Sequence, residues 1–179
     1  SLVDDSRRPR PMLDRPPIPR PSAATAGSAD RPKHNLPRSL TSLVGREREL
    51  AELGRVLAAA PLLTLVGAGG IGKTRLALEL ARDHVANYPD GSRLIELARL
   101  ADASLVPSAV AAAVGLNDID ARDITSRLAR YLRPLKRLLV LDKCEHVVEA
   151  CAELVATLLS SCPHLQVVAT SREPLAIVG

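Results

Sequence analysis

The sequence predicts an α/β fold with three layers, α/β/α, around a parallel sheet, and three observations carry that prediction. Short apolar runs suited to strands alternate with longer runs of helical periodicity. The strand predicted at 137–141 is a continuous apolar run, as expected when both faces of a strand are buried. A glycine-rich loop joins an apolar strand directly to an amphipathic helix. Strands that alternate with helices in this way form parallel sheets with helices on both sides.

Local signals place the individual elements along the chain. Glu47 and Glu49 favour the start of the first helix, because carboxylates there complement the helix dipole. The turn-like Pro89-Asp90-Gly91 precedes the second strand. A broad apolar stripe from Val147 to Leu159 indicates a helix packed on the sheet. The predicted strands are 62–66, 93–97, 137–141 and 165–169, and the predicted helices are 50–59, 76–86, 105–114, 124–132 and 145–159.

Charge and proline content divide the chain into two parts. Residues 1–40 contain eight Lys or Arg against four Asp or Glu, together with eight of the fourteen prolines, whereas residues 41–179 contain sixteen residues of each charge. A segment so poor in periodic apolar residues cannot build a core. We therefore expect residues 1–36 to be a disordered, Pro- and Arg-rich linker and residues 37–179 to form one globular domain.

Composition also excludes several classes of protein. The globular part is neutral, lacks Phe and Trp, and offers only Tyr88 and Tyr131 for base stacking, so we predict no nucleic-acid surface and no nucleic-acid partner. No apolar stretch is long enough to span a membrane and no signal peptide is visible, which predicts a cytoplasmic protein without a membrane partner. The three cysteines lack the C-x-x-C spacing of a zinc site, and Cys151 is predicted to lie in the core.

The sequence LVGAGGIGKT has the Gly-x-x-x-x-Gly-Lys-Thr spacing of a P-loop (Walker A motif), preceded by a strand and followed by a helix. Glycines let backbone N–H groups approach phosphate oxygens closely, and the helix start near Lys73 adds its dipole. Lys73 is predicted to bind the β and γ phosphates of ATP or ADP, and the Thr74 hydroxyl to bind Mg²⁺. The residues predicted to bind nucleotide here are Gly67, Gly69, Gly70, Ile71, Gly72, Lys73, Thr74 and Arg75.

A second motif ends the strand predicted at 137–141, where four apolar residues lead to Asp142 about seventy residues after the P-loop. This Walker B pattern aims a carboxylate at the metal, so Asp142 is a predicted Mg²⁺ ligand and catalytic residue. The next residue is Lys143, which cannot act as a base while protonated. Glu145 is the nearest candidate for a catalytic base, and an equally good interpretation makes it a carboxylate at a helix start.

Arg172 follows the last predicted strand at its carboxyl end, the edge of the sheet where the phosphates lie. It is predicted to contact the γ-phosphate and so to report whether that group is present.

With these residues in place, the chain resembles the STAND class of AAA-like P-loop ATPases, and within it the NB-ARC-like module of large bacterial LuxR-type and related transcriptional regulators. The similarity covers about 145 of 179 residues and includes Leu43 to Glu49, which fits the family's hhGRExE motif, followed by GAGGIGKT, LLVLDKCEHV and VVATSREPL. It implies that Gly45 and Arg46 lie near the nucleotide base and that Arg172 occupies the sensor position.

The chain departs from this family at two points. Lys143 stands where the family usually has Asn, which adds a positive charge beside the metal site. Relatives also continue beyond the equivalent of Gly179 with a fifth strand and further regions, so we expect this domain to be incomplete at its carboxyl end. In the family's sheet order the first strand would then lie at an unpaired edge.

Three functions remain open at this stage. The leading hypothesis is an ATP- and ADP-binding switch module of a signalling or transcriptional regulator, with slow or no hydrolysis and with other domains or proteins of a regulatory assembly as partners. The second is an active P-loop ATPase or small-molecule kinase. The third is a truncated remnant that acts only by binding a partner.

Overall fold

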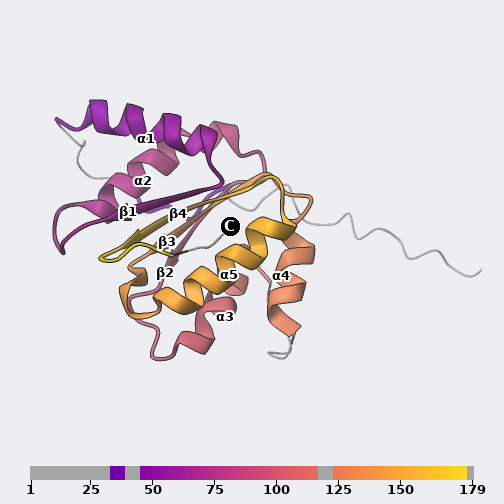
Figure 1. The fold of residues 1–179 in the computed structure, drawn as a ribbon. Helices are drawn as coiled ribbons and strands as arrows, with labels where there is room; N and C mark the ends of the chain where they lie inside the picture. Colours follow the sequence, from indigo (N-terminus) through magenta and orange to yellow (C-terminus); the bar gives the residue numbers. More distant parts are fainter. Residues whose placement is uncertain (1–32, 39–44, 117–122, 177–179) are drawn as a thin grey trace, which may run out of the picture. The chain divides into compact units, whose positions relative to one another are not determined.

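Four parallel strands form the central sheet, in the order β1-β4-β3-β2. The computed structural model describes residues 33–38, 45–116 and 123–176, all in one compact unit, and the sheet lies at its centre (Figure 1). Successive strands are joined through helices, as parallel pairing requires. The strands are β1 (Leu62–Val66), β2 (Ser92–Glu96), β3 (Arg137–Asp142) and β4 (Leu165–Ser171).

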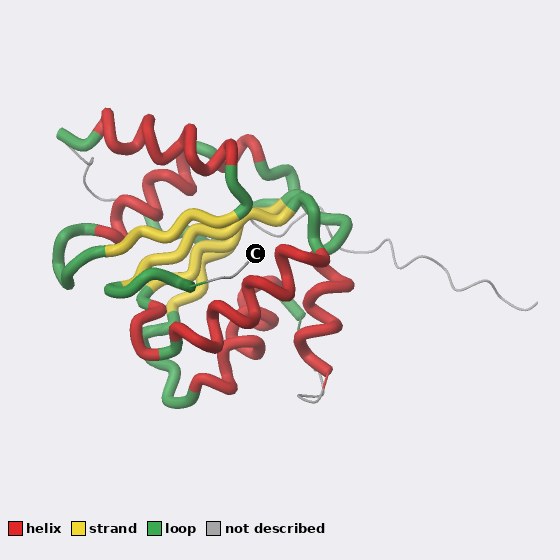
Figure 2. Tube along the Cα trace, viewed as in Figure 1, coloured by secondary structure: helices red, strands yellow, loops and turns green. Residues whose placement is uncertain are grey.

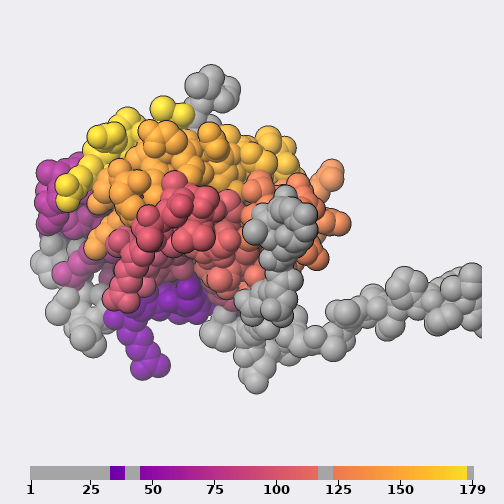
Figure 3. All heavy atoms as spheres, turned by 90° about the horizontal axis from the view of Figure 1, so that it is seen from below, coloured from indigo at the N-terminus to yellow at the C-terminus, as the bar shows by residue number. Residues whose placement is uncertain are grey.

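Helices cover both faces of this sheet, so the predicted three-layer α/β/α fold is confirmed (Figures 1 and 2). One face carries α1 (Glu47–Ala59) and α2 (Lys73–Asp83), and the other carries α3 (Val106–Val114), α4 (Ile124–Leu132) and α5 (Val148–Ser161). Figure 3 shows this second face as spheres, with α3 lying against the chain of α5. The short 3-10 turns are η1 (Val85–Asn87), η2 (Ala103–Leu105) and η4 (Cys144–His146).

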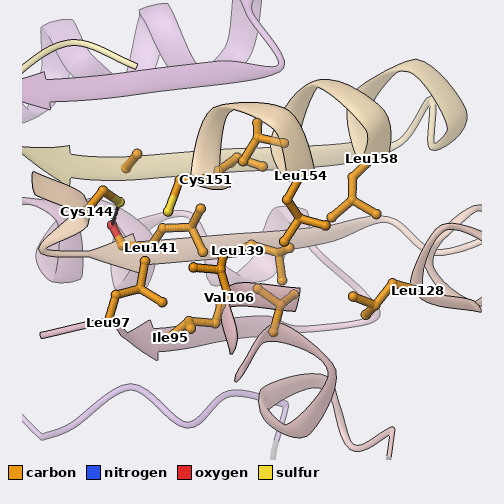
Figure 4. Close-up of a cluster of buried hydrophobic side chains, with 14 of the residues drawn as sticks. Ile95, Leu97, Val106, Leu128, Leu139, Leu141, Cys144, Cys151, Leu154 and Leu158 are labelled. Carbon is orange, nitrogen blue, oxygen red and sulfur yellow. Dashed lines mark hydrogen bonds between the residues drawn. The ribbon is translucent and has the colours of Figure 1, made fainter. Parts of the chain in front are cut away.

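Strand β3 lies between two hydrophobic clusters, which is why its sequence is an unbroken apolar run. Alternate side chains point to opposite faces: Leu138 and Val140 join the cluster under α1 and α2, whereas Leu139 and Leu141 join the cluster under α3, α4 and α5. Figure 4 shows the second cluster, where Leu154 of α5 lies over these strand residues. Every residue of β3 is buried.

Most predicted boundaries agree with the structure, and the differences have local causes. The strand at 62–66 and the helix at 124–132 match without a shift. Strands β3 and β4 run further than predicted, to Asp142 and Ser171, so their polar ends belong to the sheet. The helix predicted from 145 begins instead at Val148, because Lys143 turns left-handed and a 3-10 turn intervenes.

Residues 33–36, which the sequence placed in the linker, pack against the outer edge of β2. The Asn35 side chain exchanges two hydrogen bonds with the backbone of Leu94, and Ser92 N donates to Lys33 O. Gly91 permits this approach, because a Cβ there would lie 1.9 Å from Lys33 O. These four residues correct the predicted linker; residues 1–32 lie outside the described part of the chain.

At the opposite edge, β1 pairs with β4. Within residues 33–38, 45–116 and 123–176, β1 has no second neighbouring strand. In the same ranges no helix combines the length and apolar character needed to cross a membrane.

Candidate functional site

The glycine-rich loop leaves β1 at Val66 and ends at Gly72, the residue before α2. Gly72 has a φ of 89°, a left-handed conformation that favours glycine, and a Cβ there would lie 3.2 Å from the Arg46 guanidinium. The loop therefore joins a strand to a helix start, as predicted. Backbone N–H groups in the first turn of a helix have no intrahelical partner, so the start of α2 can bind an anion.

Lys73, the first residue of α2, folds its side chain back over this loop. Its Nζ donates to Gly67 O at 2.6 Å and to Ala68 O at 2.8 Å. The ammonium is thus held at the centre of the loop by weak neutral acceptors. A phosphate oxygen carries more charge than a carbonyl oxygen and would make a stronger hydrogen bond to it.

The predicted pair of metal ligands, Thr74 and Asp142, lie in direct contact. Thr74 Oγ1 donates to Asp142 Oδ1 at 2.6 Å, although the two residues are 68 positions apart in the chain. Asp142 is only 4% exposed and accepts a second hydrogen bond of 2.6 Å on the same oxygen from Thr170 Oγ1. The carboxyl ends of β3 and β4 therefore bring three oxygen-bearing side chains together beside the start of α2.

Glu145 and Arg172 face each other across the same edge of the sheet. Their Oε1 and Nε atoms are 3.7 Å apart, and the Arg172 guanidinium lies 3.4 Å from the ideal Cβ position of Gly69. Arg172 thus stands between the glycine-rich loop and η4. The other carboxylate oxygen of Glu145, Oε2, is buried without a hydrogen-bond partner among the described residues. An unpaired buried carboxylate oxygen is costly in a folded protein, and such groups are often found at functional sites.

Gly45 and Arg46 lie beside the end of the glycine-rich loop that leads into α2. Arg46 forms an ion pair with Glu49, with an Nε to Oε2 distance of 2.6 Å, and donates from Nη1 to Ile71 O at 3.1 Å. Gly45 N donates to Glu47 Oε1, and the hydrogen bonds from the backbone N–H groups of Glu47 and Gly45 lower the pKa of that carboxyl. These contacts fix the end of the loop. The predicted role of Gly45 and Arg46 at the nucleotide base remains a prediction.

A pocket of about 740 Å³ opens over the start of α2. Several predicted residues line it, whereas Gly45, Arg46, Gly67, Ile71 and Asp142 do not. The predicted residues in its lining are Gly69, Gly70, Gly72, Lys73, Thr74, Arg75, Glu145 and Arg172.

Sequence reasoning missed several residues of this pocket. Thr170 shares the rule that identified Asp142, namely a polar residue at the carboxyl end of a parallel strand, and could have been found by it. Pro37 and Arg38 could not, because their segment resembles the linker in composition. Leu78 and Arg82 line the pocket from α2, one and two turns beyond the predicted motif.

The cysteines lie apart from this pocket. Cys144 and Cys151 are both fully buried in the cluster under α5, so the predicted core position of Cys151 is confirmed. Cys144 Sγ donates to Leu141 O at 3.6 Å (Figure 4), and a hydrogen bond with Cys151 together with burial raises the pKa of the Cys144 thiol. Across the described ranges, His, Cys, Asp and Glu side chains form no group of three that could hold a metal.

The parallel order β1-β4-β3-β2, with a glycine-rich loop between β1 and α2, defines a P-loop NTPase fold. No protein-family model matches the chain. It is 43% identical over 124 residues to the Mycobacterium tuberculosis protein named "Putative HTH-type transcriptional regulator Rv0890c". The match covers 69% of this chain and 14% of that protein. It is 35% identical over 140 residues to the regulatory protein AfsR of Streptomyces coelicolor, which is 67% of this chain and 14% of AfsR. The chain therefore spans about a seventh of these relatives.

Solved structures support the same fold at lower identity. A STAND protein with a tetratricopeptide repeat sensor, PH0952 from Pyrococcus horikoshii, has a TM-score of 0.56 and 18% identity over 80% of this chain and 23% of that one. The Aeropyrum pernix ORC1 protein, solved in complex with DNA, has a TM-score of 0.58 and 23% identity over 75% of this chain and 40% of that one. These similarities establish the fold class.

Proposed function

We propose that this domain binds ATP or ADP together with Mg²⁺ and acts as the nucleotide-dependent switch of a larger regulator. The observation that carries the proposal is the 2.6 Å hydrogen bond between Thr74, which lines the pocket, and the buried Asp142, because it joins the two predicted phosphate-site motifs. A chance glycine-rich turn would have no reason to place its Thr against a buried Asp from a distant strand.

The residues at this point fit Mg²⁺. The ion prefers hard oxygen ligands and usually takes one or two carboxylates, with water and substrate phosphates completing its shell. Thr74 and Asp142 supply two such oxygens that already lie in contact, and the described residues provide no larger acidic cage. In a bound complex Mg²⁺ would offset phosphate charge, Lys73 would bind phosphate oxygens, and Arg172 would contact the terminal phosphate.

Slow hydrolysis, or none, suits the residues around Asp142. The position that follows it holds Lys143, whose ammonium cannot accept a proton. The remaining carboxylate, Glu145, faces Arg172 with an Nε to Oε1 distance of 3.7 Å, so this oxygen already has a charged partner. A switch needs long-lived bound states more than rapid turnover.

The names of the relatives support a regulatory setting. One is named as a helix-turn-helix transcriptional regulator and another as a regulatory protein, and the matched STAND structure is titled a signal transduction ATPase. We propose that the partners of this domain are nucleotide and the other domains or proteins of such an assembly, and that this region itself makes no contact with nucleic acid.

An active ATPase is the second candidate, and one observation favours it. Glu145 Oε2 is buried without a partner in the described structure, on a residue that lines the pocket, so this oxygen could orient a water molecule. Turnover above roughly 1 s⁻¹ would support the enzyme, and slower turnover would support the switch.

Calorimetric titration of the chain with ATP and with ADP, in the presence of Mg²⁺, tests the main proposal. We expect micromolar or tighter binding that Lys73→Ala abolishes. Lys136→Ala, which removes an exposed lysine from the loop before β3, is the matched control and should bind like the parent chain. Absence of binding by a chain that circular dichroism shows to be folded would refute the proposal and favour a role limited to partner contacts.

A further inference from the structure

Lys143 has a backbone conformation that its residue type does not favour. Its φ of 62° and ψ of 60° lie in the left-handed region, and it is the only non-glycine with positive φ in the described ranges. Gly, Asn or Asp would adopt this conformation at lower cost. Residues held in such conformations gather at ligand sites, where the surrounding structure enforces them.

The neighbours of Lys143 hold this conformation in place. Lys143 N donates to Thr170 Oγ1 at 2.9 Å, and the same hydroxyl donates to Asp142 Oδ1. The fully buried Cys144 follows at once and begins η4. With the backbone fixed between two buried residues, the Lys143 side chain is exposed and lines the pocket.

The charged residues that line the pocket are mostly basic, and Lys143 is one of them. Its described lining contains a single acid, Glu145, against six basic residues: Arg38, Lys73, Arg75, Arg82, Lys143 and Arg172. The ammonium of Lys73 has two carbonyl acceptors, and Arg172 faces Glu145. In contrast, the Lys143 ammonium has no hydrogen bond or ion pair to any residue in the described part of the chain, so an anion in the pocket would not have to compete for it.

We propose that Lys143 is a second phosphate-binding lysine, which supplies part of the positive charge that Mg²⁺ supplies to a bound nucleotide and so makes ATP binding less dependent on the metal. The inference rests on the proposed nucleotide binding. It also gives a reason for a left-handed lysine beside the buried Asp142: an Asn at this position would suit the backbone better but would carry no charge.

The test compares ATP dissociation constants in Mg²⁺ and in EDTA, measured by calorimetry for the parent chain and three variants. Removal of Mg²⁺ should weaken binding about tenfold more in Lys143→Asn than in the parent chain, the effect of losing one charge-assisted hydrogen bond. Lys143→Arg should behave like the parent chain. Lys136→Asn removes the same charge far from the pocket and should leave the ratio unchanged.

The outcomes separate this inference from the proposed function. If the parent chain binds ATP in Mg²⁺ but Lys143→Asn and the parent lose the same factor in EDTA, nucleotide binding stands and the role of Lys143 is wrong. If Lys136→Asn shows the same loss as Lys143→Asn, the effect is one of net charge and the inference is also overturned. If the folded parent chain binds no ATP in either condition, both proposals fail.

Discussion

The middle of strand β3 and the segment at its carboxyl end differ in how well their residues suit the environment around them. Residues 138–141 are apolar, at most 1% exposed, and packed against helices on both faces. The next four residues comprise a buried acid, a left-handed lysine, a buried thiol and a carboxylate with an unpaired oxygen. Every local preference is met in the middle, whereas several are broken at the end.

The middle of β3 stabilises the fold, whereas the groups at its carboxyl end depend on stability supplied by the rest of the core. Burial of the apolar residues in the middle of β3 is favourable at each position, at about 25 cal/mol per Å² of surface. At the end, Asp142 is held by two hydroxyl groups, because an unpaired buried carboxylate would be unstable. Groups that break local rules collect at functional sites and depend on the surrounding core.

The largest effect is expected from the core. Leu139→Ala should lower the free energy of unfolding by about 2–5 kcal/mol, because Leu139 of β3 is 1% exposed in the cluster under α3, α4 and α5 and its truncation leaves a cavity. Val56→Ala on α1, at a side chain that is 42% exposed, is the control and should change stability by less than about 0.5 kcal/mol. Urea unfolding measures both. Equal losses would mean that burial does not distinguish these positions.

Removal of a polar group at the carboxyl ends of the strands should have the next largest effect. Thr170→Val keeps the shape of the side chain but removes the donor to Asp142 and the acceptor for Lys143 N, so we expect a loss of about 2–3 kcal/mol. Thr157→Val on the exposed side of α5 removes a hydroxyl that donates to Glu153 O and should be nearly neutral. A neutral result at Thr170 would show that this network does not support the site.

The middle of the sheet was predictable because its sequence pattern and its environment agree. An unbroken apolar run is satisfied by burial on both faces, so the buried strand β3 followed from Leu138 to Leu141. The segment at 33–36 was not predictable, because its packing depends on Gly91 and on two hydrogen bonds from Asn35 that no local pattern reveals.

The candidate site divides in the same way. The P-loop spacing singled out Thr74, and the position at a strand end singled out Asp142. The side chains of these two residues lie in contact in the structure. The contact between Glu145 and Arg172, and the left-handed turn at Lys143, arise from tertiary geometry between β3 and β4. Sequence could supply these residues as candidates but not their arrangement.

The apolar core also contains hydrogen bonds, so the contrast between the middle and the end of β3 is not simply one of apolar against polar groups. Tyr88 is 2% exposed and donates to Gln166 Oε1 at 2.7 Å, and burial raises the pKa of Tyr88 from 10.0 to about 12. The folded state holds the Tyr88 proton more tightly than the unfolded state does. The contribution of Tyr88 to folding stability is therefore complete below pH 10 and is lost as the pH rises towards 12. We expect a loss of about 2 kcal/mol by pH 12.

The titration can be followed directly. The chain has two tyrosines and no tryptophan, so in Tyr131→Phe the ultraviolet absorbance of tyrosinate reports Tyr88 alone. Ionisation near pH 10 in the folded protein would contradict the burial argument. In Tyr88→Phe, the part of the stability loss that this group contributes between pH 10 and 12 should disappear.

The smallest effect should have the opposite sign, and it lies at Lys143. Lys143→Asn should raise the free energy of unfolding by about 0.5–1 kcal/mol, because Asn tolerates the left-handed backbone that lysine occupies at a cost. Lys143→Ala keeps that cost and should leave stability nearly unchanged, which separates the backbone from the charge. Urea unfolding without nucleotide measures both variants. A gain for Asn combined with weaker ATP binding in EDTA would mean that the lysine lowers stability and strengthens ligand binding, whereas a loss for Asn would mean that the turn prefers lysine for reasons of packing.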